Sequence, residues 1–176
     1  MENSIKAYFE NAQLSMAAYA GLTTGISGQA YVDALKAIGF SEALAKEFIG
    51  LDASGNRIAD KGYNVIHSYS DTASGFAATL FEDRATGQRI LAIRGTEPTD
   101  AGDLAADAAI ALGQLPTAQI TALESYRVFL QNNLDANGLP FLPGGVSIGV
   151  TGHSLGGYLS QYAGTEWQLS PGSGGE

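Results

Sequence analysis

The chain has 176 residues, of which 45% are hydrophobic and 15% charged, and this is enough apolar material for the core of one domain. The composition excludes a disordered chain, which combines low hydrophobicity with high charge. Eighteen acidic against nine basic residues give a net charge of −9, so a phosphate backbone would repel the protein and we expect no nucleic-acid partner.

Residue types needed for disulfide and metal chemistry are scarce. The sequence has no cysteine, which excludes disulfides, thiolate zinc sites and cysteine nucleophiles. It has two histidines, His67 and His153, so we expect no metal site. No signal peptide is visible after Met1, and no apolar run approaches the roughly 18 residues of a transmembrane helix, so no transmembrane segment is predicted.

Three helices are predicted in the first fifty residues. The first is capped by Asn3 or Ser4, and apolar residues spaced three and four apart indicate it: Ile5, Tyr8, Phe9, Ala12, Met16 and Tyr19. The second ends at Gly39, and the third runs from Ser41, a favourable N-cap, to Gly50.

The pattern then changes to that of a sheet. Residues 63–69 alternate, and residues 76–82 and 88–94 are strand-like runs joined by a short polar connection, which predicts a β-hairpin. Helices are predicted over residues 104–112 and from Thr117 onward, then a strand over 146–151 and a helix over 155–164. Helical crossovers favour parallel strands, so we predict one α/β domain over residues 1–176 with a mixed sheet and a flexible tail at 170–176.

The motif Gly152-His153-Ser154-Leu155-Gly156 lies between the last predicted strand and helix. In a nucleophile elbow of this Gly-x-Ser-x-Gly pattern, the serine occupies a strained turn, and the two glycines keep side chains out of the close contact between strand and helix. The helix N-terminus then directs its amides toward an anion beside the serine. The pentapeptide alone is a weak signal, and a Gly-rich turn with an unreactive serine is the alternative.

Several segments resemble class 3 (fungal-type) lipases of the α/β-hydrolase fold. Residues 150–157 resemble the nucleophile elbow of that family, and Ile93-Arg94-Gly95-Thr96 resembles its Arg-Gly-Ser/Thr oxyanion motif. Residues 103–107 resemble the helix start that supports this motif, and residues 14–19 are similar to the N-terminal helix of the family. The resemblance implies an α/β-hydrolase-like fold.

The resemblance also implies roles for four residues. Ser154 would be the nucleophile, Thr96 would supply an amide and its hydroxyl to the oxyanion hole, and Leu155 would supply the second amide. Asp107 would hold the Thr96 hydroxyl. Fixed donors at a developing oxyanion are worth on the order of 3 kcal/mol each. The alternative for Thr96 is an ordinary loop threonine, and the alternative for Asp107 is an acid favoured by the first turn of a helix. The family needs no cofactor for this chemistry.

A base for Ser154 is missing from its expected place. A serine hydroxyl needs a base, normally a histidine oriented by an acid, and in this fold both follow the serine in the chain. After Ser154 the sequence has the acids Glu166 and Glu176 and no histidine. We expect His67 and His153 to be structural. The resemblance therefore implies an apparently truncated domain, completed by a C-terminal region or a complementing chain.

The function implied by the resemblance is hydrolysis of lipid carboxylic esters, as in triacylglycerol lipases, at a lipid–water interface, with this chain inactive alone. A phospholipase A1, a short-chain esterase or a thioesterase on the same fold is the first alternative. The second is a catalytically silent chain that binds a partner through the open sheet edge at residues 146–151. Some bacterial members are exported without an N-terminal signal, so the expectation on localisation is extracellular.

Overall fold

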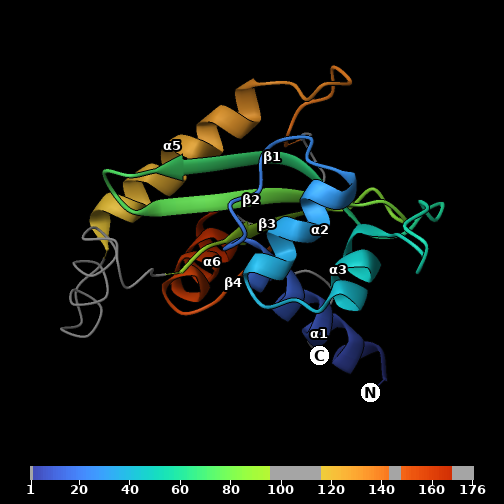
Figure 1. Cartoon of the computed structure of the whole chain (residues 1–176). Helices are drawn as coiled ribbons and strands as arrows, with labels where there is room; N and C mark the ends of the chain where they lie inside the picture. The colour runs from blue at the N-terminus through green and yellow to red at the C-terminus, as the bar shows by residue number, and fades with distance from the viewer. Residues whose placement is uncertain (1, 96–115, 143–147, 168–176) are drawn as a thin grey trace.

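The computed structural model describes residues 2–95, 116–142 and 148–167 (Figure 1). The predicted helix over residues 104–112 and the predicted tail lie outside these residues. The described elements, in chain order, are α1 (Glu2–Ala17), α2 (Gly28–Ala37), α3 (Glu42–Ile49), β1 (Tyr63–Asp71), β2 (Phe76–Asp83), β3 (Arg89–Ile93), α5 (Thr117–Asn132), β4 (Gly149–Gly152) and α6 (Leu155–Glu166).

The four strands form one mixed sheet in the order β1-β2-β3-β4. β1, β2 and β3 pair antiparallel, whereas β4 pairs parallel to β3, with Ile93 opposite Gly152. This confirms the predicted hairpin and the change to a parallel strand. In the described part of the chain, β4 is bonded to β3 alone and forms an edge of the sheet.

Helices cover both faces of this sheet. On one face, α5 and α6 pack on Phe76, Leu80 and Leu91, and Leu123 and Leu159 complete that core. On the opposite face, α1, α2 and α3 pack on the alternate residues of the same strands, among which Phe81 and Ala92 are buried. Figure 1 shows the sheet between these two groups of helices. The chain is therefore a layered α/β structure with a hydrophobic core on each side of one sheet.

Local signals explain where α3 begins and ends. The Ser41 side chain accepts a hydrogen bond from the Leu44 amide at 3.1 Å, as an N-cap does. Gly50 closes the helix in the left-handed conformation at φ 74°. A side chain at Gly50 would collide with the Lys61 carbonyl, so the backbone itself requires glycine here. Both predicted ends of this helix are confirmed.

The first helix differs from its prediction. It begins at Glu2, ahead of the expected caps Asn3 and Ser4, and ends at Ala17. Its buried side chains are Leu14, Ser15 and Ala17, and Ala18, directly after the helix, is buried as well. Most of the expected apolar face is exposed instead, with these exposed fractions: Ile5 70%, Tyr8 66%, Phe9 57% and Met16 42%.

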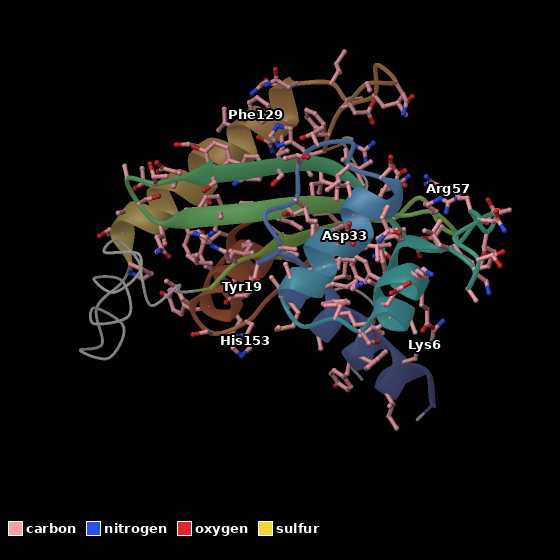
Figure 2. The ribbon with its side chains drawn as sticks, viewed as in Figure 1. Lys6, Tyr19, Asp33, Arg57, Phe129 and His153 are labelled. Carbon is pink, nitrogen blue, oxygen red and sulfur yellow. The ribbon has the colours of Figure 1, made fainter. Side chains whose placement is uncertain are left out.

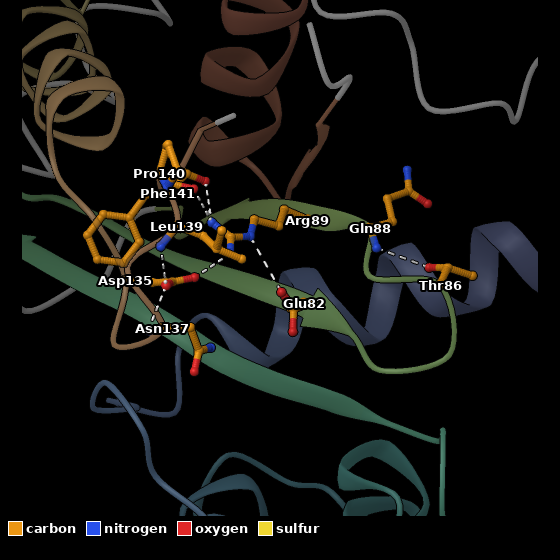
Figure 3. Close-up of polar contacts among 9 residues, drawn as sticks. All are labelled: Glu82, Thr86, Gln88, Arg89, Asp135, Asn137, Leu139, Pro140 and Phe141. Atoms are coloured by element: carbon orange, nitrogen blue, oxygen red, sulfur yellow. Dashed lines mark hydrogen bonds and ion pairs between the residues drawn. The ribbon is translucent and has the colours of Figure 1, made fainter. Parts of the chain in front are cut away.

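A buried arginine joins the segment after α5 to β3. The Arg89 guanidinium donates to the carbonyl oxygens of Pro140 and Phe141 at 2.6 and 2.8 Å and to the Asp135 carboxylate at 2.6 Å (Figure 3). A second carboxylate, Glu82, lies 3.5 Å from its Nε. Since the side chains of Arg89 and Asp135 are 7% and 6% exposed, the charge of each depends on the other.

The Asp135 carboxylate is also bonded by its own loop. It accepts the backbone amides of Asn137 and Leu139 at 2.9 and 3.0 Å. Burial alone would raise the pKa of Asp135, but the two amides and Arg89 outweigh burial and lower this pKa below its ordinary value. The carboxylate is thus held in its charged form.

Candidate active site

Ser154 lies in the turn between β4 and α6 with backbone angles of φ 57° and ψ −127°. This region is disfavoured for a residue with a Cβ, and in the described residues only Asp60 and Ser154 have a positive φ without being glycine. The Ser154 side chain is exposed, and its hydroxyl has no hydrogen-bond partner within the described part of the chain. The predicted strand–turn–helix around the serine is confirmed.

Two glycines permit the close contact between β4, α6 and the end of β3. A Cβ on Gly152 would collide with the Gly156 carbonyl and lie 2.8 Å from the Ser160 hydroxyl. A Cβ on Gly156 would collide with the Ile93 carbonyl and lie 3.0 Å from the amide nitrogen of Gly95. Any larger residue at either position would push the helix away from the sheet, so the contact that fixes Ser154 requires both glycines.

The residue after Arg94 contacts the same turn. A Cβ built on Gly95 would collide with the His153 carbonyl and lie 3.2 Å from the Ser154 Cβ. The Gly95 amide donates a hydrogen bond to the Tyr19 hydroxyl at 2.9 Å. The end of β3, the end of α1 and the serine turn therefore meet at one point, although the sequence indicated no contact between Tyr19 and Gly95.

The first amides of α6 face the turn. Within the turn, the Gly156 amide donates to the His153 carbonyl at 3.0 Å, and the Gly157 amide donates to the Ser154 carbonyl at 2.9 Å. In the part of the chain that the structure describes, the amide of the buried residue Leu155 has no partner. An unpaired amide at a helix N-terminus, next to a serine, suits a developing negative charge.

The other two predicted members of the site, Thr96 and Asp107, lie outside the described residues, and their roles stay predictions. Gly95 brings the chain to the serine turn directly before Thr96.

His67 lies far from Ser154. In the strand register, His67 on β1 lies opposite Leu80 on β2, which lies opposite Leu91 on β3, which lies opposite Val150 on β4. Three strand spacings of about 4.8 Å therefore separate His67 from β4 by about 14 Å.

The His67 side chain packs against α5 instead. Its Nδ1 is 2.9 Å from the Tyr126 hydroxyl, and its ring contacts those of Tyr126, Phe129 and Phe141. Burial lowers the pKa of His67. It is a structural residue of the α5 layer.

His153 and Glu166 do not form an acid–base pair with Ser154. Figure 2 shows the exposed His153 at the surface, directed away from the sheet. Glu166 ends α6, about 18 Å along the helix from Ser154 at 1.5 Å per residue. Among the described residues, no group of three histidine or acidic side chains could hold a metal ion.

A cleft of about 420 Å³ opens beside Tyr19, on the face covered by α1. Hydroxyl-bearing residues dominate its wall, among them Tyr19, Thr23, Ser68 and Thr79, and Arg94 lines it as well. The cleft therefore adjoins the point where α1, β3 and the serine turn meet.

Comparisons with known proteins add no assignment to this geometry. No family model matches the sequence, and no curated protein and no solved structure is significantly similar to it. Among the described helices, none has both the length and the apolar character to cross a membrane. The established class is accordingly a mixed α/β fold with a strained serine at a strand–helix turn.

Proposed function

We propose that this chain carries the nucleophile of a serine ester hydrolase of the α/β-hydrolase type that acts on lipid esters. The observation that supports this most is the Ser154 backbone at φ 57° and ψ −127° between β4 and α6. Such strain persists only where the surrounding structure imposes it, and it concentrates at functional sites. The lipid part of the proposal depends on the resemblance to class 3 lipases.

The chemistry follows from the turn. The Ser154 oxygen attacks the ester carbonyl carbon while a base takes the hydroxyl proton, and the carbonyl oxygen becomes an oxyanion next to the Leu155 amide. The amide and hydroxyl of Thr96 complete the oxyanion hole in this proposal. Collapse of the tetrahedral intermediate expels the alcohol, which takes a proton, and water then cleaves the acyl-enzyme.

The base comes from a group other than the two imidazoles of this chain. His67 lies across the sheet, and the exposed His153 side chain is directed away from the sheet. We therefore propose that a further segment or a complementing chain supplies the acid and base.

A fluorophosphonate probe tests the nucleophile directly. In this reaction the Ser154 oxygen bonds to phosphorus, fluoride leaves, and the proton passes to a base. Intact mass is measured for the folded wild type and Ser154→Ala, with and without imidazole as an added base. We expect labelling of the wild type that depends on imidazole and none of the variant. If the wild type is labelled, rates across a series of ester chain lengths would define the substrate. Absence of labelling in both conditions would contradict the proposal.

The position of β4 favours a second candidate function. In the described residues this strand is hydrogen-bonded on one side only, which makes it a template for an added strand. A catalytically silent chain would use this edge to bind a partner. Concentration-dependent association without labelling of Ser154 would support this second function.

A further inference from the structure

We infer that Tyr19 is a positioning residue of the oxyanion hole, an inference that rests on the proposed function. Its hydroxyl accepts the Gly95 amide at 2.9 Å. Gly95, which follows β3, lies directly against the serine turn. The phenol therefore holds the end of β3 against the turn that carries Ser154 and the Leu155 amide.

The distances place Tyr19 beside the reacting serine. A Cβ built on Gly95 would lie 2.6 Å from the Tyr19 hydroxyl oxygen and 3.2 Å from the Ser154 Cβ, so these two atoms are within about 6 Å of each other. Figure 2 shows Tyr19 and His153 at the same end of the molecule. The phenol thus acts at the site itself, through the backbone that borders Ser154.

The local structure fixes the phenol in this place. A tight turn follows α1, in which the Tyr19 amide donates to the Met16 carbonyl at 3.0 Å. The helix before it is tied to β4 by a hydrogen bond of 2.8 Å between the hydroxyls of Ser15 and Thr151. Since α1 is anchored to β4 and reaches the end of β3, it bridges the two strands that flank the candidate oxyanion hole.

The hydrogen bond also decides which amide can stabilise an oxyanion. The Gly95 amide is committed to Tyr19 and is not available to a substrate oxygen. The amide of Leu155 has no such partner in the described part of the chain. Among the described residues, Tyr19 therefore leaves the Leu155 amide as the donor for an oxyanion, and loss of the Tyr19 hydroxyl would release a competing donor and loosen the end of β3.

The test compares Tyr19→Phe with Tyr126→Phe. Each substitution removes one hydroxyl. That of Tyr19 accepts the Gly95 amide at 2.9 Å, whereas that of Tyr126, on α5, lies 2.9 Å from the His67 Nδ1. The first readout is fluorophosphonate labelling of Ser154 with imidazole present, separated into the maximal rate and the half-saturating probe concentration. We expect Y19F to lower the maximal rate by roughly ten- to a hundredfold, with half-saturation within about twofold, because small misplacements of a donor cost rate rather than binding. Y126F should change neither.

The second readout needs no activity. Amide hydrogen exchange of Gly95, followed by NMR, should accelerate about tenfold or more in Y19F and stay unchanged in Y126F, since a lost hydrogen bond exposes the amide. An active wild type with unchanged labelling in Y19F would overturn the role of Tyr19 alone. A folded wild type that labels under no condition would overturn the proposed function and this role with it. Equal slowing in both variants would show a general structural effect and also overturn the inference.

Discussion

The strained backbone at Ser154 makes a prediction about stability that is independent of any substrate. Replacement of Ser154 by Ala and by Gly removes the same hydroxyl, but only Ala keeps a Cβ at φ 57° and ψ −127°. We expect Ser154→Gly to be the more stable of the two, because glycine adopts this conformation without the steric penalty.

The size of the difference follows from two opposing contributions. A residue with a Cβ in this region costs about 1–3 kcal/mol, whereas glycine loses about 0.4–1 kcal/mol more than alanine through the flexibility of its unfolded chain. The net expectation is that Ser154→Gly exceeds Ser154→Ala by about 1 kcal/mol in the free energy of unfolding. For a protein of this length, that corresponds to a difference of about 2–4 °C in Tm.

Urea unfolding followed by circular dichroism measures this difference, and Ser160 supplies the matched control. Ser160 lies inside α6 with an ordinary helical backbone, and its hydroxyl bonds the Gly156 carbonyl. There the order should reverse, with Gly less stable than Ala by about 1 kcal/mol. If Ser154→Gly were no more stable than Ser154→Ala, the serine would not be strained, and the main support for the proposed nucleophile would be lost.

Three further predictions concern contacts that surround the site or support the sheet. Gly152→Ala should destabilise the fold by about 2–3 kcal/mol in urea, because its Cβ collides with backbone, whereas Gly164→Ala in the open part of α6 should stabilise it by up to about 1 kcal/mol. Asp135→Asn should cost about 3 kcal/mol, because it removes the buried carboxylate that pairs with the Arg89 guanidinium, whereas Glu82→Gln should cost less than about 1 kcal/mol, because Glu82 is more exposed; equal losses would refute the assignment of the buried pair. The folded pKa of His67 is lowered, so unfolding takes up a proton and stability falls as the pH drops below about 6.5. Between pH 7 and 5, the free energy of unfolding should decrease less steeply in His67→Phe than in the wild type. An identical decrease would show that protonation of His67 does not cause it.

Local patterns predicted the elements whose residues interact with near neighbours in the chain. The cap of α3, the hairpin and the strand–turn–helix at Ser154 each depend on residues a few positions apart. In α1, by contrast, both faces carry apolar or small residues, so periodicity did not distinguish the face that packs on the sheet.

Contacts between distant segments had no local signal. The bond from the Gly95 amide to Tyr19 joins the start of the chain to the end of β3, and the pair of Arg89 and Asp135 joins β3 to the segment after α5. A single tyrosine, arginine or aspartate in the sequence does not identify its partner. Only the topology of the sheet brings these pairs together.

The parallel pairing of β4 has a consequence for the order in which the site forms. β1, β2 and β3 are joined by short turns, whereas β4 reaches β3 through the whole connection from Ile93 to Gly149. Contacts between near segments form early, and long loops close late. We therefore expect the turn that carries Ser154 to form late in folding, and undocking of the four-residue strand β4 would displace Ser154 while β1, β2 and β3 stay paired.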